Sequence, residues 1–277
     1  MEKQIVCINW GTKYGAPYVN RLYKMVEANI TPPFRFVCFT DNSDDFLPEI
    51  DCFDLPPMPG FMPKNTLGKW PKSRLWAPEL GDLKGAFLFI DLDVVITGSL
   101  DSFFEYGDPD DVVLARNAAK PLHRLGQTSI YRMPVGALAP LQQIFANDPQ
   151  AVADKYRFEQ HFVTKNAPNG IKFWPRTWVQ HFRIQCIPRF PLNYFTAPKV
   201  PRDCRVVIFA GSLNPPDAMV GQYKETLPHL PRRAHIKRAF SMKRPLRALR
   251  QFYFPAKWVS DIWGKADAST AAERKTD

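Results

Sequence analysis

The segment GAFLFIDLDVVIT, residues 85–97, constrains the fold more than any other part of the chain. Its five consecutive apolar residues, 86–90, run directly into Asp91. An uninterrupted apolar run of this length is typical of a central strand that is buried on both faces, in a sheet covered by helices on both sides. The sequence therefore predicts an α/β fold with a largely parallel sheet. Because ligands in such sheets bind at the carboxyl ends of the strands, Asp91 falls where a site is expected.

The rest of the chain supports this fold, since predicted strands and helices alternate along the first ninety residues. Apolar residues at helical spacing predict a helix over 18–28, and the proline-rich stretch 56–72 predicts a loop. The other predicted helices cover 73–80, 141–145 and 159–163, and the predicted strands cover 4–9, 34–39, 50–55, 111–114, 128–133 and 205–210.

The composition excludes several classes of protein. The chain has 277 residues, of which 45% are hydrophobic and 23% charged, so it is neither wholly disordered nor collagen-like. It contains no apolar run of the roughly 18 residues that a membrane span needs. The first residues lack the pattern of a secretory signal. Five cysteines without a C-x-x-C pair predict reduced thiols rather than disulfides or a metal site. We therefore expect a cytoplasmic protein.

The net charge of +10 is concentrated near the C-terminus. Residues 232–258 hold nine basic side chains and no acidic one, interleaved with apolar and aromatic residues. A basic, aromatic-rich amphipathic segment predicts binding to an anionic membrane surface, here as a peripheral protein on the inner face of the cytoplasmic membrane. The alternative is that its apolar stripe packs on the main domain while the charges are solvated. No nucleic-acid partner is expected, because the chain has no RNA- or DNA-binding motif.

The candidate chemistry lies in Asp91-Leu92-Asp93. In an extended segment, carboxylates at i and i+2 project to the same side, with Leu92 on the other. Placed at the end of a strand, they form a hard-oxygen site for Mn²⁺ or Mg²⁺, which bind through one or two carboxylates together with substrate phosphates. The competing interpretation is that two acidic residues end a strand in solvent.

Two enzyme classes place Asp-x-Asp after a buried strand. In haloacid-dehalogenase-like phosphohydrolases the motif stands on the opening strand, whereas here it comes about ninety residues into the chain. The second class is the nucleotide-sugar glycosyltransferases with a GT-A fold. The segments KSRLWAPEL and GAFLFIDLDVVITGSLDSFF, with the opening IVCINWGTKYGAPYVNRLYKMV, resemble bacterial GT-A glycosyltransferases similar to family 8. The resemblance covers about residues 4–217.

This resemblance implies a GT-A-like (Rossmann-like) fold, a mixed, mostly parallel sheet flanked by helices, with a basic helical C-terminal extension. The expected parts are a GT-A-like catalytic domain over 1–222, the basic extension over 223–266 and a disordered tail over 267–277. The implied activity is metal-dependent transfer of a hexose from a nucleotide sugar, a UDP-sugar, to a surface-polysaccharide or glycolipid acceptor, with retention of anomeric configuration.

The resemblance also assigns roles to individual residues. Asp91 and Asp93 match the metal ligands, and Leu92 lies between them in the donor-binding segment. Lys72 matches a basic residue that approaches phosphate or sugar, and Glu159 and Gln160 match a pair that lines the donor sugar and acceptor. The loop that faces the nucleotide matches Asn9, Gly11, Thr12 and Tyr14, and the segment that contacts the sugar matches Gln127, Thr128 and Ser129.

One position departs from the family pattern. Relatives have a histidine, the third metal ligand, where this chain has Ala210. Either a water or Asp217 replaces it, or metal binding is weaker. Two alternatives follow: a catalytically attenuated nucleotide-sugar-binding or membrane-tethering protein, and a phosphohydrolase that uses Asp91 and Asp93.

Overall fold

The computed structural model describes residues 2–66, 70–209, 211–224, 226–227 and 229–273, with residues 267–273 described by their backbone only. The chain forms two compact units. The first comprises the residues up to Leu92 together with Ser99–Arg176, and the second comprises Asp93–Gly98 together with the residues from Thr177 onward.

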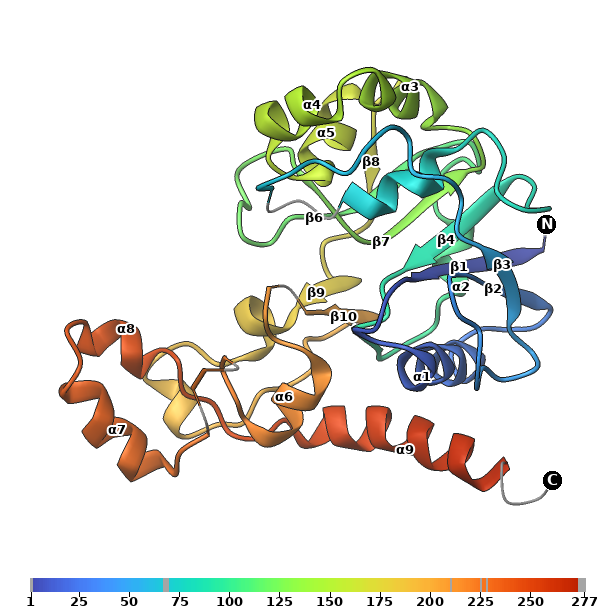
Figure 1. Ribbon diagram of the computed structural model, residues 1–277. Helices are drawn as coiled ribbons and strands as arrows, with labels where there is room; N and C mark the ends of the chain where they lie inside the picture. The colour runs from blue at the N-terminus through green and yellow to red at the C-terminus, as the bar shows by residue number, and fades with distance from the viewer. Residues whose placement is uncertain (1, 67–69, 210, 225, 228, 274–277) are drawn as a thin grey trace. The chain divides into compact units, whose positions relative to one another are not determined.

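The first unit is built on a mixed, mostly parallel sheet, shown in Figure 1. Its strand order is β3-β2-β1-β4-β7-β6-β8. Neighbours from β3 to β4 run parallel, β7 is antiparallel to both β4 and β6, and β6 is parallel to β8. The strands are β1 (Lys3–Asn9), β2 (Phe34–Thr40), β3 (Asp51–Asp54), β4 (Ala86–Ile90), β6 (Val113–Arg116), β7 (Gly126–Pro134) and β8 (Lys172–Phe173). The expected α/β sheet is confirmed.

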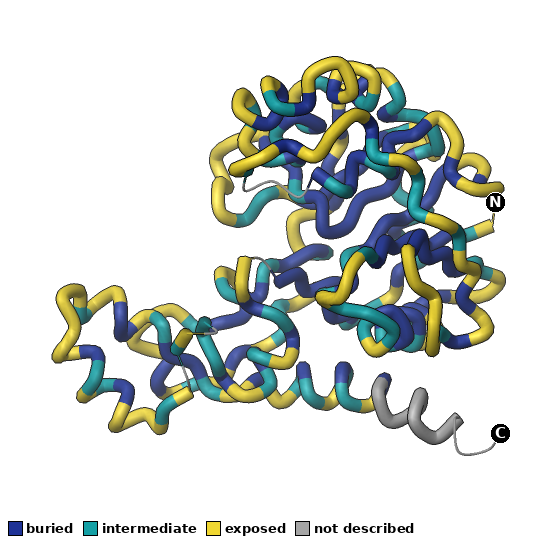
Figure 2. Tube along the Cα trace, in the orientation of Figure 1, coloured by how far each residue is buried: buried dark blue, intermediate teal, exposed yellow. Residues whose placement is uncertain are grey.

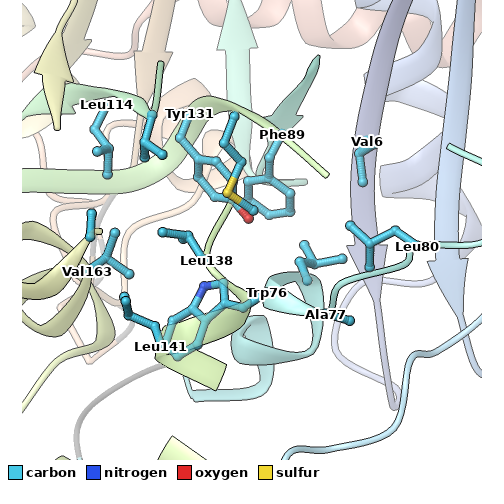
Figure 3. Close-up of a cluster of buried hydrophobic side chains, with 14 of the residues drawn as sticks. Val6, Trp76, Ala77, Leu80, Phe89, Leu114, Tyr131, Leu138, Leu141 and Val163 are labelled. Atoms are coloured by element: carbon cyan, nitrogen blue, oxygen red, sulfur yellow. The ribbon is translucent and has the colours of Figure 1, made fainter. Parts of the chain in front are cut away.

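Helices cover both faces of this sheet, which is why β4 is apolar throughout. On one face, α1 (Ala16–Glu27) packs Tyr23 against Phe36 of β2, with their rings 5.5 Å apart. The opposite face carries the larger core, in which Trp70 stacks on Phe145 at 5.0 Å. Figure 3 shows part of this core, including Trp76, Phe89 and Tyr131. This face is covered by the 3₁₀ helix η1 (Trp70–Trp76) and by α3 (Ala139–Asn147), α4 (Pro149–Tyr156) and α5 (Glu159–Asn166), while α2 spans Asp101–Glu105. The helix predicted over 73–80 is thus a 3₁₀ helix that begins earlier.

The second unit holds a small sheet of order β5-β10-β9 and the basic C-terminal helices. Tyr194 stacks on Phe252 at 4.6 Å in a separate apolar cluster of this unit. Its elements are β5 (Val94–Ile96), β9 (Val179–His181), the π-helix η2 (Phe182–Cys186), the 3₁₀ helix η3 (Leu192–Tyr194), β10 (Val206–Ile208), α6 (Pro215–Val220), α7 (Arg232–Phe240), α8 (Pro245–Leu249) and α9 (Lys257–Glu273). The basic extension is helical, as expected.

The division into units differs from the expected domain boundaries. The second unit begins at Thr177 rather than at 223, and it includes the short segment Asp93–Gly98. Helix α9 runs to Glu273, past residue 266. Residues 274–277 of the expected tail, and Ala210, lie outside the described residues. In the described part of the chain, no helix has the length and apolar character that crossing a bilayer requires.

Candidate active site

The polypeptide turns sharply where β4 ends. Asp91 follows Ile90, and its backbone N–H donates to the carbonyl oxygen of Ser129 on β7 at 2.8 Å. Leu92 and Asp93 form a turn before β5 begins at Val94. The expectation of an extended Asp-x-Asp segment was therefore wrong. The chain has to leave the first sheet here, because β5 pairs with β10 of the other sheet.

This turn decides which atoms of the motif are accessible. The side chain of Leu92 is buried, at 4% exposure, so only its backbone can face a ligand. Asp91 and Asp93 are both half-buried. Their carboxylates are thus accessible to solvent without being fully hydrated.

Lys72 of η1 forms a salt bridge with Asp91. Its ammonium Nζ lies 2.6 Å from Oδ1 and 2.8 Å from Oδ2 of the carboxylate. The same nitrogen donates to the carbonyl oxygen of Thr128 at 3.1 Å and lies 5.2 Å from the centre of the Phe89 ring. The side chain of Lys72 is only 9% exposed. A lysine this buried needs such partners, so the salt bridge fixes Asp91 at the strand end.

Strand β7 and helix α5 supply the polar groups next to this salt bridge. The hydroxyl of Thr128 donates to Oε1 of Glu159, the first residue of α5, at 2.7 Å. Glu159 is 5% exposed, and Gln160 beside it is half-buried. Tyr131 has a pKa raised well above its usual value, first by burial and then by the charges of Asp91 and Glu159. Both carboxylates therefore act on the same buried phenol.

The amide of Gln127 fixes the conformation of this end of β7. Its Nε2 donates to Oγ of Ser129 at 2.6 Å, and its Oε1 accepts from the backbone N–H of Ser129 at 2.7 Å. Both polar atoms of the Gln127 amide are therefore hydrogen-bonded to Ser129. The structure thus brings together five of the predicted site residues in one polar network: Lys72, Asp91, Thr128, Ser129 and Glu159.

The loop after β1 forms a second polar group. Asn9 is buried and paired in register with Thr40 of β2, and its Nδ2 donates to Oγ1 of Thr40 at 3.2 Å. The Oδ1 atom of Asn9 accepts from the backbone N–H of Gly15 at 3.3 Å. These bonds hold the two ends of the loop together, so Asn9 has a structural part in shaping it.

The tip of this loop is open to solvent. Gly11 and Thr12 are exposed, and Gly11 has φ of +64°, which favours glycine. The backbone N–H of Gly11 donates to Oδ2 of Asp41 at 2.9 Å. Tyr14 is half-buried, with its ring 4.7 Å from that of Tyr18. Asp41 directly follows β2, so the sequence, with its predicted strand over 34–39, already places it at the carboxyl end of a parallel strand, where ligands are expected.

The two polar groups belong to paired parallel strands. β1 and β4 run side by side, with Val6 opposite Phe89, so Asn9, the last residue of β1, and Asp91, which follows β4, lie at the carboxyl ends of their strands. This is the edge at which open α/β sheets bind ligands. The pairing of Lys72 with Asp91, which are nineteen residues apart, was not predicted, and no local pattern signals it.

The donor chemistry at Asp91 and Asp93 suits a divalent cation. Among the described residues, no three or more His, Cys, Asp or Glu side chains gather into a metal site. Mg²⁺ typically takes only one or two carboxylates and completes its shell with water and substrate phosphates. A carboxylate has about four lone-pair directions, so Asp91 can accept from Lys72 and still bind a cation. Each carboxylate therefore has the donor chemistry of such a ligand, with a diphosphate completing the shell of the ion.

No protein-family model matches the sequence, and no curated protein matches it. Solved structures of glycosyltransferases do resemble the chain. The galactosyltransferase LgtC, in complex with donor and acceptor sugar analogs, is 15% identical with a TM-score of 0.54, over 76% of this chain and 88% of its own. The chain shares the fold of this enzyme.

Two further solved structures agree. The bifunctional glycosyltransferase WbbM is 12% identical with a TM-score of 0.53, over 90% of this chain and 51% of its own. The glycosyltransferase GlyE of Streptococcus pneumoniae TIGR4 is 10% identical with a TM-score of 0.53, over 95% of this chain and 64% of its own. These likenesses confirm the GT-A-like fold that the sequence predicts, while membership of family 8 stays a prediction.

Proposed function

We propose that the protein is a metal-dependent glycosyltransferase that moves a hexose from a UDP-sugar to a surface-polysaccharide or glycolipid acceptor. The observation that carries this proposal is the polar network of Lys72, Asp91, Thr128 and Glu159 at the carboxyl end of β4. A fold shared with glycosyltransferases supports the same reaction class. Because the sequence resembles family 8 glycosyltransferases, we also propose that the transfer retains the anomeric configuration of the sugar.

Asp91 and Asp93 are the proposed ligands of Mn²⁺ or Mg²⁺. Bound there, the ion would act as a Lewis acid that stabilises the negative charge of the departing nucleoside diphosphate. Lys72 offsets one of the two carboxylate charges and holds Asp91 in place before the donor binds. Preorganised charges of this kind stabilise a developing charge without reorganising during the reaction.

The loop formed by Asn9, Gly11, Thr12 and Tyr14 is the proposed nucleotide side of the donor site. The exposed backbone around Gly11 can approach a nucleotide closely, because glycine has no side chain to obstruct it. Tyr14 offers an aromatic face for contact with the base. Asn9 acts through its hydrogen bonds to Thr40 and Gly15, which set the shape of the loop.

The donor sugar is proposed to bind next to Asp91, away from this nucleotide loop. Glu159 and Gln160 are the proposed groups that orient the sugar and the acceptor, since a carboxylate accepts from hydroxyls and an amide both donates and accepts. Thr128 holds the carboxylate of Glu159 through its 2.7 Å hydrogen bond, and Ser129 is fixed by Gln127. These residues are the proposed contacts of the hexose, on the polar network that holds Asp91.

Residues 232–258 are the proposed membrane contact. Nine basic side chains, with the apolar side chains that stay exposed at Phe240, Met242 and Leu246, would hold the protein peripherally on an anionic membrane, on the inner face of the cytoplasmic membrane. A lipid-linked acceptor would then meet the enzyme at that surface.

The deciding experiment is calorimetric titration of UDP with and without Mn²⁺. Wild type is compared with Asp93→Asn, and with Asp110→Asn as a matched control at an exposed position of the first unit. We expect affinity that requires Mn²⁺ and is lost only in Asp93→Asn. No binding of UDP under any condition would refute the nucleotide-sugar donor.

Variants of the same two aspartates also distinguish the two alternative functions, a phosphohydrolase and a catalytically attenuated binding protein. In a phosphohydrolase, Asp91→Asn removes the nucleophile and abolishes phosphatase activity. An attenuated binding protein would bind UDP with Mn²⁺ but would neither transfer nor hydrolyse the sugar. We expect UDP-sugar turnover in wild type and no phosphatase activity.

A further inference from the structure

The turn between α7 and α8 in the second unit borders a pocket of about 490 Å³. Four of its lining side chains are basic: Lys224, Lys243, Arg244 and Arg247. Of the described residues, none that lines it is acidic. Thr226 and Gln251 add a hydroxyl and an amide to the lining. Positive charge and neutral donors on several sides are the features of a site for a phosphate group.

These four basic side chains line one pocket, at positions that are mostly exposed. Within the described part of the chain, no carboxylate forms a salt bridge with any of the four. Lys243, Arg244 and Arg247 are exposed, and Lys224 is half-buried. Like charges gathered in this way repel one another, and a bound anion relieves that repulsion. The cluster therefore has a physical reason to take up an anion.

The scaffold under the pocket is packed rather than loose. Ala248, at 5% exposure, lines the pocket and also belongs to the apolar cluster of Tyr194 and Phe252. Asn193 is buried and donates to the carbonyl oxygens of Leu249 at 3.1 Å and Phe252 at 2.8 Å. The backbone from which Arg244 and Arg247 extend is thus anchored, and a pre-organised site loses less entropy when it binds.

Exposed apolar side chains stand beside these charges. Phe240 is 67% exposed, Met242 43% and Leu246 64%. Figure 2 shows most of the turn between α7 and α8 as exposed. A neighbourhood of cations and exposed apolar groups matches a bilayer surface, where phosphates lie next to acyl chains, and it matches nucleic acid poorly because that offers no apolar phase.

We infer that this pocket binds the phosphate of an anionic lipid headgroup while Phe240, Met242 and Leu246 enter the adjoining acyl region. This rests on the membrane association proposed above and assigns it to a defined site. The remaining basic residues of 232–258 contribute general attraction to the surface, and the pocket contributes specific contacts with one phosphate.

Two double variants distinguish specific binding at the pocket from general electrostatic attraction to the membrane. Lys243→Gln with Arg247→Gln removes two charges that line the pocket, and Arg233→Gln with Lys237→Gln removes one arginine and one lysine from exposed positions of α7 that do not line it. Partition into vesicles of phosphatidylcholine with phosphatidylglycerol is measured by co-sedimentation. We expect the pocket pair to weaken partition at least about tenfold more than the control pair, because charge-assisted hydrogen bonds add to the general attraction.

Each other outcome overturns the inference in a different way. Equal losses in the two pairs would mean that charge alone attaches the protein, with its membrane association intact. Wild-type binding to inorganic phosphate but not to the vesicles would mean a site for a free anion. No binding to either would refute both the pocket and the membrane contact, whereas UDP titration of the same protein tests the donor site independently.

Discussion

Replacing Lys72 with methionine tests how much the salt bridge to Asp91 stabilises the first unit. Methionine keeps the length and apolar stem of the side chain but removes the ammonium, which lies 2.6 and 2.8 Å from the two carboxylate oxygens. The change leaves a half-buried carboxylate without its cation. Breaking a buried pair in this way costs about 3–5 kcal/mol. Because the side chain of Asp91 is 19% exposed and can be partly rehydrated, we expect a loss of about 2–3 kcal/mol.

The double variant Lys72→Met, Asp91→Asn gives the sharper result. It also removes the carboxylate charge that has lost the ammonium of Lys72, so it should be more stable than Lys72→Met alone, by about 1–2 kcal/mol. Urea unfolding followed by tryptophan fluorescence measures this, since Trp70 and Trp76 are buried in the same helix as Lys72. Lys165→Met, at an exposed position of α5, serves as the control. Effects within about 0.5 kcal/mol of that control, or simple additivity in the double variant, would refute the reasoning.

Three other predictions concern pH, a hydrogen bond and the metal. Burial, with smaller effects of neighbouring charge, lowers the pKa of His235 to about 4. This histidine alone should therefore cost roughly 3 kcal/mol of stability as pH falls from 6.5 to 4, because the unfolded chain takes up the proton more readily than the folded one. His235→Gln should make the pH dependence shallower by that amount in urea unfolding at several pH values, while His181, whose pKa is lowered in the same way, keeps its own share; an unchanged slope would contradict this. Thr128→Val should destabilise by about 2 kcal/mol in thermal unfolding, since it deprives buried Glu159 of its 2.7 Å hydrogen bond, whereas Thr128→Ser should retain most of the stability. In Lys72→Met, Mn²⁺ should bind the nucleotide-free protein about tenfold more tightly by calorimetry, because a competing cation has left Asp91, and unchanged affinity would argue against Asp91 as a ligand.

Much of the framework follows from local sequence patterns. The apolar run of β4 predicts a strand buried on both faces, and the structure buries all five of its residues. Helical spacing predicts α1 within two residues of its observed start and one of its end. Because parallel strands share a carboxyl edge, Asn9 and Asp91 could be predicted to lie at strand ends on the same edge of the sheet. Each of these inferences depends on a short window of sequence and on one geometric rule.

Several contacts within the site could be identified only from the tertiary structure. Lys72 could be predicted as a donor-site residue, but its salt bridge with Asp91 joins a 3₁₀ helix to a strand end nineteen residues away. The hydrogen bond between Thr128 and Glu159 likewise spans thirty-one residues. Such contacts depend on how complete elements pack, which no local propensity encodes.

The sequence by itself determined that this chain forms an α/β sheet with acidic residues at the end of its central strand and a basic helical extension. The tertiary structure decided that Leu92 and Asp93 turn rather than extend, because β5 pairs with β10 more than a hundred residues later. It also decided that the charges near Arg244 border a pocket, since the packing of Ala248 and Leu249 against Phe252 fixes that turn. Apolar periodicity is a local property of the chain, whereas the pairing of distant strands and the closing of a turn depend on the summed burial of the whole unit.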